Sequence, residues 1–342
     1  MLKSGVFITC FTRSIYLSKL IDILREVKPP YVFIASDGPR ENNKDDLKKI
    51  ENCREKFNEI DWDCKVYKFY YEENLGILKN NYESLKKVFE VVDRVIMLED
   101  DMLPSKSFFY FCDELLEKYK DDYRIQRICG GNFIGIREEV SSDYFFARCV
   151  YSGAGAIWKR TFENIDFSYE FTQDKYTLDL FNCLCDANYI KHFKKDILKE
   201  RTSYEMGLDI LSFEKYYRTN FYLQSQCNIF PKNNLVKNQG VSKESIHNGN
   251  NINIFPKRIK KLFLLECNEI DWPIKHPKYI TCDLNYEKYI QKKINLFSFK
   301  HKMLYFLKRS ILELRYNGLS SFYSRIKKRI SLNLKKMTDK NG

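Results

Sequence analysis

Residues 94–111 read RVIMLEDDMLPSKSFFYF, an apolar run that meets three consecutive carboxylates before a second apolar segment. The run at 94–98 predicts a buried strand, and Glu99, Asp100 and Asp101 follow at its carboxyl end. In an extended chain, residues two apart point the same way. We therefore expect Glu99 and Asp101 on one side of the strand and Asp100 on the other.

Strands and helices alternate over the first 135 residues. Helical spacing of apolar residues predicts a helix after the first strand, through Leu17, Leu20, Ile21 and Leu24. Apolar runs rich in β-forming residues predict strands at 5–11, 29–38, 64–71, 94–98 and 125–133. This alternation is typical of βαβ units, so we expect an α/β fold with a mostly parallel sheet and helices on both faces. Ligands of such sheets bind at the carboxyl ends of the strands.

Three carboxylates this close repel one another, and a divalent cation would relieve that repulsion directly. Mg²⁺ and Mn²⁺ prefer oxygen ligands and are often held by one or two carboxylates together with substrate phosphates. The alternative is an acidic turn that faces solvent before a helix capped by Ser105 or Ser107. Since the turn follows the fourth strand of an α/β sheet, we favour the metal site.

The pattern becomes less regular after residue 140. The segment YFFARCVYSGAGAIWKR (144–160) indicates a strand, a glycine-rich loop and the start of a helix. Residues 174–186 and 208–222 follow helical spacing. The stretch 228–248 is rich in Asn and Gly, which favours a long loop at a site or at its rim. From about residue 290 the tail indicates two helices broken at Asn317-Gly318.

These patterns predict one large α/β domain at 1–285 and a basic, amphipathic helical tail at 286–342.

The chain has 342 residues and is 44% hydrophobic, which is enough for a large core. No run of about 18 apolar residues occurs, so we expect no transmembrane helix. The N-terminal MLKSGVFITCFTRS is typical of a first strand and not of a signal peptide. The eleven cysteines show no CxxC pair and no zinc-site spacing, which favours reduced thiols and a cytoplasmic location.

Net charge is concentrated in the tail. Residues 292–336 carry thirteen Lys or Arg and one acid, Glu313, so this segment has the full +12 of the chain. One apolar stripe runs through Leu304, Leu307, Ile311 and Leu314. This pattern predicts an amphipathic anchor on an anionic membrane surface. The alternative is that the stripe packs on the catalytic domain. We expect no nucleic-acid partner, because the tail has no RNA-binding motif and no separate stacking platform.

The stretch LEDDMLPSKSFFYF (98–111) resembles the metal-binding DxD-type motif of GT-A glycosyltransferases. It is most similar to the EDD motif of the N-acetylglucosaminyltransferase I type and of bacterial family-2-like, hemolysin-labelled relatives. Four further stretches resemble elements of that family in the same order, so the resemblance spans residues 3 to 250. They are ASDGPR (35–40), ENLGILKNNYESL (73–85), YSGAGAIWKRTFENIDF (151–167) and NLVKNQGVSKESIHN (234–248).

The resemblance implies a GT-A, Rossmann-like fold, a nucleotide-diphosphate sugar as donor, and Mn²⁺ or Mg²⁺ as cofactor. It also implies that the domain at 1–285 is catalytic, with a nucleotide-binding half at 1–135 and an acceptor half at 136–285. By position, Asp37 would contact the base or ribose and Asp100 the ribose or sugar. Asp101 would bind the metal with Glu99 beside it, and His247 matches a histidine that would contact the metal or a phosphate.

Arg13, just after the first strand, is a candidate to hold the nucleotide. An N-capping or surface arginine is the alternative reading for this residue.

An inverting transferase also needs a base that takes the proton of the acceptor hydroxyl. The segment SYEMGLDILSF (203–213) offers Glu205 and Asp209, and we prefer Asp209 because LD aligns with a WD pair of the bacterial relatives. An ordinary helix acid is the alternative at this position.

The expected function is a metal-dependent, inverting glycosyltransferase that acts at the inner face of the cytoplasmic membrane. Its acceptor would be a glycan or a lipid-linked acceptor in the synthesis of a surface polysaccharide such as lipopolysaccharide or capsule. The alternative is a non-catalytic protein that binds glycan or nucleotide on the same fold.

Overall fold

The structure is a computed structural model that describes residues 2–338 except 42, 152, 182–186, 206–212, 242–251, 256 and 294–298. The chain divides into two compact units. The first unit comprises residues 1–239 and 265–291, and the second comprises 240–264 and 292–342. Each unit is described by itself below.

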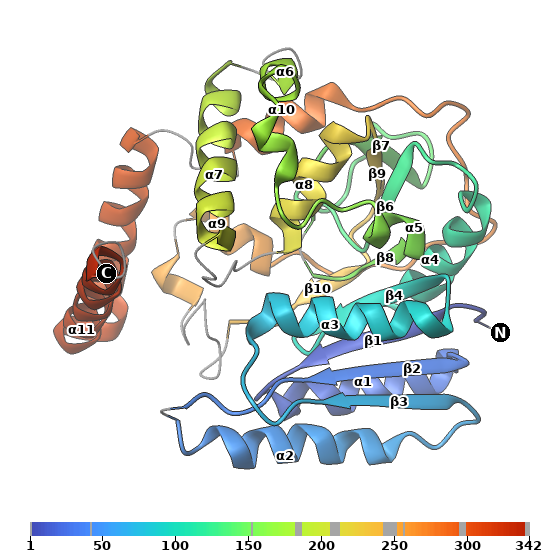
Figure 1. Cartoon of the computed structure of the whole chain (residues 1–342). Coiled ribbons are helices and arrows are strands. Elements are labelled where there is room, and N and C mark those ends of the chain that lie inside the picture. Colours follow the sequence, from blue (N-terminus) through green and yellow to red (C-terminus); the bar gives the residue numbers. More distant parts are fainter. Residues whose placement is uncertain are drawn as a thin grey trace. The chain divides into compact units, whose positions relative to one another are not determined.

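An eight-stranded sheet forms the centre of the first unit (Figure 1). Its strands are β1 (Gly5–Cys10), β2 (Tyr31–Ser36), β3 (Lys65–Tyr70), β4 (Arg94–Glu99), β6 (Ile125–Cys129), β7 (Tyr144–Ala147), β8 (Gly155–Trp158) and β9 (Cys227–Pro231). Their spatial order is β3-β2-β1-β4-β8-β6-β9-β7. Strands β1 and β2, β1 and β4, β2 and β3, and β6 and β9 pair in parallel, while β8 runs antiparallel to β4 and β6, and β7 to β9. The predicted α/β fold with a mostly parallel sheet is confirmed.

Helices lie on both faces of this sheet. Helix α1 (Ser14–Val27) contacts α2 (Asp46–Lys56) and α4 (Lys106–Lys118). Helix α3 (Gly76–Val91) contacts β2 and crosses in front of the strands in Figure 1, whereas α1 lies behind them. The other helical segments of this part are η1 (Phe57–Glu59), α5 (Lys159–Glu163), η2 (Glu170–Gln173), α6 (Lys175–Leu180), α7 (Ala187–Glu205), α8 (Phe213–Leu223) and α10 (Leu284–Lys293).

The order of the strands changes direction at β1. From β1 the chain passes to β2 and β3 on one side, and then crosses to β4 on the other side. In the ladder between β1 and β4, Thr9 pairs with Glu99, and the Asp100 N–H donates to the Thr9 carbonyl at 3.0 Å. The carboxyl ends of β1 and β4 therefore lie side by side where the strand order reverses, which is where open α/β sheets bind their ligands.

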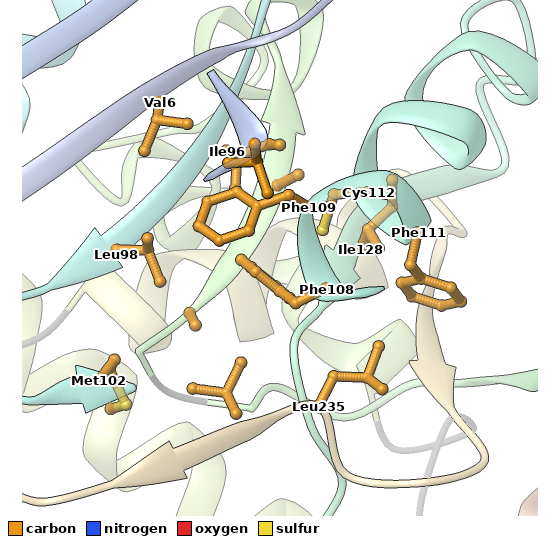
Figure 2. Close-up of a cluster of buried hydrophobic side chains, with 14 of the residues drawn as sticks. Val6, Ile96, Leu98, Met102, Phe108, Phe109, Phe111, Cys112, Ile128 and Leu235 are labelled. Atoms are coloured by element: carbon orange, nitrogen blue, oxygen red, sulfur yellow. The ribbon is translucent and has the colours of Figure 1, made fainter. Parts of the chain in front are cut away.

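The core beneath this edge fixes the position of the acidic turn. Ile96 and Leu98 of β4 lie in one cluster with Phe108 and Phe109 of α4 (Figure 2), and all four side chains are buried. Full burial of such side chains contributes about 1.5–3 kcal/mol each. Ser105, one of the two caps considered from the sequence, caps α4: its Oγ accepts a hydrogen bond from the Phe108 N–H at 3.2 Å. The turn at residues 100–101 is thus held between a buried strand and a capped helix.

Two features of the second half differ from the prediction. Residues 144–160 contain a second strand, β8, where the sequence indicated only a glycine-rich loop and a helix start. Its first residue must be glycine, because a Cβ at Gly155 would lie 2.5 Å from the Ile128 carbonyl oxygen. The predicted long loop at 228–248 instead holds β9 and β10 (Val236–Asn238), and β10 pairs antiparallel with β5 (Met102–Pro104). In the first half, the predicted fifth strand at 125–133 is shorter than expected and ends at Cys129.

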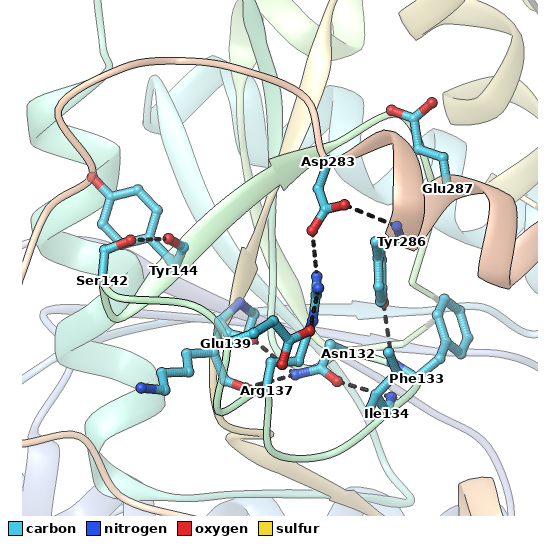
Figure 3. Close-up of polar contacts among 12 residues, drawn as sticks. Asn132, Phe133, Ile134, Arg137, Glu139, Ser142, Tyr144, Asp283, Tyr286 and Glu287 are labelled. Carbon is cyan, nitrogen blue, oxygen red and sulfur yellow. Dashed lines mark hydrogen bonds and ion pairs between the residues drawn. The ribbon is translucent and has the colours of Figure 1, made fainter.

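Arg137 fastens the segment 265–291 to the sheet (Figure 3). Its guanidinium pairs with Asp283 at 2.7 Å and with Glu139 at 2.5 Å, and it lies over the rings of Phe145 and Tyr286. The Asp283 carboxylate also accepts from the Tyr286 N–H at 2.9 Å, which holds the first turn of α10. One buried cation thus ties a late segment of the chain to the loop before β7 and to the Phe145 ring of that strand.

The second unit contains η4 (Ile252–Ile254), α9 (Lys257–Phe263) and α11 (Phe299–Thr338). Helix α11 is interrupted at Gly318, whose φ of 79° and ψ of 177° are not helical, so the predicted break at Asn317-Gly318 is confirmed. The Arg309 guanidinium lies over the Phe255 ring at 4.9 Å. Within the described residues, every helix is too short or too polar to cross a membrane.

Candidate functional site

Arg13 joins the carboxyl ends of β1 and β4. Its Nη2 lies 2.5 Å from Oδ1 of Asp100, and its Nη1 lies 2.5 Å from Oδ2 of Asp101. Asp100 and Asp101 are 1% and 6% exposed, so both carboxylates are shielded from water. The two acids raise the pKa of Arg13, although its burial acts in the opposite direction. Three of the predicted site residues are thus brought together.

The predicted alternation of the three acids is wrong in part. Strand β4 ends at Glu99, and Asp100 and Asp101 form a turn. Because the chain leaves the extended conformation there, both aspartates can reach the same guanidinium. The second oxygen of Asp100 accepts from the Phe11 N–H at 3.1 Å, which ties the turn to the loop after β1. Burial raises the pKa of Asp100 to about 6, while Arg13 opposes that rise.

Asp101 keeps one oxygen free among the described residues. Its Oδ2 pairs with Arg13, but its buried Oδ1 has no hydrogen-bond partner in that part of the chain. Its carbonyl accepts from the Gln239 N–H at 2.8 Å, just beyond β10. An unpartnered buried carboxylate oxygen costs free energy unless a cation or a donor completes it.

The donor set of this turn fits a hard divalent cation that also takes phosphate oxygens. Asp101 offers a free oxygen, and Asp100 lies beside it. Mg²⁺ is typically held by one or two carboxylates plus substrate phosphates. In the part of the chain that the structure describes, no group of three or more His, Cys, Asp or Glu side chains is arranged as a metal site. The protein alone would therefore supply only part of the coordination shell.

Glu99 has a different environment from the two aspartates. It lies two residues after Met97, whose sulfur is 4.0 Å from the hydroxyl of Tyr217 on α8, so both side chains face α8. Burial, with the charges of Asp101, Glu214 and Asp100, raises the pKa of Glu99 to about 8. Glu214, at the start of α8, was not among the predicted residues. Nothing in its local sequence distinguishes it from an ordinary acid in a first helical turn.

Asp37 holds the start of α3. Its Oδ1 accepts from the Gly38 and Leu75 N–H groups at 3.1 and 2.7 Å, and its Oδ2 accepts from the Gly76 N–H at 2.9 Å. Burial raises the pKa of Asp37, and these backbone donors oppose the rise. The predicted contact with the base or ribose stays a prediction, and the structure adds a local structural role.

The stretches 35–40 and 73–85 are physically interlocked. The Asn74 side chain donates to the Gly38 carbonyl at 2.8 Å, and the Gly38 N–H donates to the Glu73 carbonyl at 3.2 Å. A Cβ on Gly38 would lie 2.4 Å from the Glu72 carbonyl oxygen, so only glycine fits there. Gly76 has a φ of 75°, which also favours glycine. The glycines at 38 and 76 and the side chain of Asn74 therefore serve one structural purpose, which is to hold the two loops together.

Arg127 is a buried cation that the prediction missed. It is 3% exposed, its Nη2 donates to the Gly153 carbonyl at 2.7 Å, and its guanidinium lies 4.9 Å from the ring centroid of Tyr217. Its Nε has no hydrogen-bond partner within the described residues. A charged residue in the middle of the predicted strand IQRIC was a signal that could have identified it. It supports the glycine-rich segment next to β4.

Two predicted residues cannot be placed. Asp209 and His247 lie outside the described residues, so their predicted roles stay predictions. Glu205, the other candidate base, is the last residue of α7, and its side chain is also outside the described part.

No protein-family model matches the chain, and no curated protein matches it. Two of the solved structures that match are a UDP-glucose pyrophosphorylase complexed with UDP-glucose and a mannose-1-phosphate geranyltransferase from Thermus thermophilus. The first is 14% identical and covers 48% of this chain and 71% of its own, with a TM-score of 0.24. The second is 12% identical and covers 68% of this chain and 75% of its own, with a TM-score of 0.27. Both likenesses are too distant to carry an argument about activity.

Proposed function

We propose that the chain is a metal-dependent glycosyltransferase that uses a nucleotide-diphosphate sugar. The observation that supports this most is the meeting of Arg13, Asp100 and Asp101 at the point where the strand order reverses. An open α/β sheet binds its ligand at that point. A guanidinium beside two carboxylates, one of them with a free oxygen, suits a ligand that brings both a cation and a diphosphate.

Each residue of the turn has a role in this proposal. Asp101 would hold the cation through its free Oδ1, with Asp100 beside it, and Arg13 would contact the diphosphate. Bound there, a divalent cation would stabilise the negative charge that develops on the leaving nucleoside diphosphate. Asp37 would keep the loops after β2 and β3 in position for the base or ribose.

Transfer to an acceptor hydroxyl needs a general base. Asp209 remains our preferred candidate, with Glu205 as the alternative. Inversion at the sugar carbon, and a glycan or lipid-linked acceptor of surface polysaccharide synthesis, are further parts of the proposal that rest on the resemblance of the sequence.

Calorimetry with a panel of UDP-, GDP-, CMP- and dTDP-sugars, with and without Mn²⁺, tests the proposal. We expect Mn²⁺-dependent binding of one donor to the wild type and its loss in Asp101→Asn. Arg25→Gln, a change at an exposed arginine that pairs with Asp22 and Asp61, is the matched control and should bind as the wild type does. Binding without turnover of the donor would favour the non-catalytic alternative. If the wild type bound no donor, the proposal of a glycosyltransferase would be rejected.

We also propose that the tail binds an anionic membrane surface. Leu307 and Ile311 on the apolar stripe of α11 are 51% and 64% exposed. The segment 292–336, which includes most of α11, carries thirteen cations, each worth about 1 kcal/mol near an anionic leaflet. A transferase with a lipid-linked acceptor would gain from such an anchor, because its acceptor lies in the plane of the membrane.

Cosedimentation of the full chain with phosphatidylglycerol vesicles tests the anchor. We expect salt-sensitive binding that Ile311→Glu weakens and that Ile15→Glu, a matched change at an exposed isoleucine of α1, leaves unchanged. Equal binding to neutral phosphatidylcholine vesicles, or binding to oligonucleotides but not to vesicles, would contradict the proposal.

A further inference from the structure

The guanidinium of Arg13 occupies the position from which a cation would neutralise Asp100 and Asp101. It lies 2.5 Å from one oxygen of each carboxylate, so a single positive charge spans the pair. A divalent cation that bound both aspartates would need the space and the charge compensation that Arg13 now supplies. Two cations this close would also repel each other.

Arg13 is held differently from Arg160, another partly buried arginine. Arg160 donates to four backbone carbonyls, those of Tyr119, Lys120, Asp122 and Ile125, so a movement of its guanidinium would break four hydrogen bonds. The Arg13 guanidinium, by contrast, has hydrogen bonds and ion pairs only with the two carboxylates among the described residues. If another cation took over these acids, Arg13 would lose no other partner in that part of the chain.

The position of Arg13 also permits such a movement. It precedes α1 as the N-cap residue, and its side chain makes no capping bond. Its side chain is 18% exposed, so the guanidinium can reach solvent or an incoming anion. Arginine presents several N–H donors in a fork that matches phosphate oxygens.

We propose that Arg13 is an exchangeable counter-ion: it holds Asp100 and Asp101 in the free protein and leaves them when a divalent cation binds. Arg13 and the cation therefore compete in the absence of nucleotide. In the free protein Arg13 keeps the acidic turn in shape before the cation arrives, and once released it can contact the diphosphate. The inference rests on the proposed function for the cation that Asp101 would hold.

Mn²⁺ titration without nucleotide, followed by electron paramagnetic resonance of free Mn²⁺, tests the competition. We expect Arg13→Met to bind Mn²⁺ more tightly than the wild type by about tenfold or more, since an opposite charge at this range changes the proton affinity of a carboxylate by about 10- to 1000-fold. Arg13→Lys keeps the charge and should lie between the two. Arg25→Gln should match the wild type, and Asp101→Asn should lose the binding.

Thermal melting of each variant shows whether it folds, so that a lost signal is not mistaken for lost affinity. Equal or weaker Mn²⁺ binding by folded Arg13→Met would overturn the inference. The nucleotide-sugar panel gives a separate result. If Arg13→Met binds Mn²⁺ more tightly but no donor binds the wild type, the exchange of Arg13 is supported and the proposed function is rejected. If the wild type binds a donor with Mn²⁺ but Arg13→Met binds Mn²⁺ as the wild type does, the proposed function is supported and the exchange is rejected.

Discussion

Thr9 and Glu99 face each other across the parallel ladder of β1 and β4, and the next hydrogen bond along that ladder runs from the Asp100 N–H to the Thr9 carbonyl. This register decides which residues meet beyond the ends of the strands. Arg13 follows β1 by three residues and Asp100 follows β4 by one, and their side chains form an ion pair. The candidate site is therefore a consequence of strand register and of the reversal in strand order.

Removal of Arg13 should destabilise the metal-free protein. Arg13→Met leaves two shielded carboxylates without their partner, and we expect a loss of about 2–4 kcal/mol in the free energy of unfolding. Urea denaturation in a chelating buffer at pH 8 measures it. Arg25→Met removes only exposed ion pairs and should cost less than about 1 kcal/mol. Equal losses in the two variants would show that the ion pairs of Arg13 stabilise the fold no more than the exposed pairs of Arg25 do.

Glu99 should make the metal-free protein less stable as the pH rises. Its pKa is about 8 in the folded chain, against an ordinary value of 4.5, so the folded state holds a proton that the unfolded state releases between these values. The free energy of unfolding attributable to Glu99 therefore falls between about pH 4.5 and pH 8. Urea denaturation of wild type and Glu99→Gln across this range, in chelating buffer, should show a flatter profile for the variant. A wild-type advantage that grows with pH would contradict the assignment.

Gly38 should be intolerant of any side chain. A Cβ there would lie 2.4 Å from the Glu72 carbonyl oxygen, and the backbone of the neighbouring loop would have to shift. We expect Gly38→Ala to lower the free energy of unfolding by about 1–3 kcal/mol. The control is Asn74→Ala, which removes the hydrogen bond to the Gly38 carbonyl without a clash and should cost about 1 kcal/mol. If Gly38→Ala were as stable as the wild type, the close packing of the two loops at Gly38 would be refuted.

Arg137 should hold the segment 265–291 in place. Arg137→Met breaks its pairs with Asp283 and Glu139 and its contacts with two aromatic rings, for an expected loss of about 2–4 kcal/mol. Limited proteolysis should then cut this segment faster than in the wild type. Glu139→Gln, at a side chain that is 64% exposed, should change little. Uniform cleavage along the chain of Arg137→Met would point to general unfolding instead.

The sequence predicts the first half of the fold well because its strands and helices are separated by clear changes of periodicity. The strands near Val6, Ile34 and Leu98 are all present, and Ser105, one of the two caps considered, caps α4. Periodicity cannot identify β8, since its four residues begin with glycine and contain no alternation of polar and apolar side chains.

The site is predictable in composition but not in arrangement. Asp100 and Asp101 were predicted because they follow the fourth strand of the sequence pattern. Arg13 was predicted because it follows the first strand. The ion pairs between them depend on a turn that breaks the extended chain at Asp100, and no local pattern shows where that break falls. Arg127 and Glu214 depend on how α8 packs on the sheet, which is a tertiary contact between distant segments.

The most direct test of the central claim is the phosphorus magnetic resonance of the nucleoside diphosphate that the binding panel identifies, recorded with and without Mn²⁺. If Asp101 holds a cation that contacts the diphosphate, both phosphorus signals of the bound nucleotide will broaden strongly with Mn²⁺ in the wild type. The broadening will be lost in Asp101→Asn and kept in Arg25→Gln. Nucleotide binding with no Mn²⁺ broadening in the wild type, or with the same broadening in Asp101→Asn, would contradict the account.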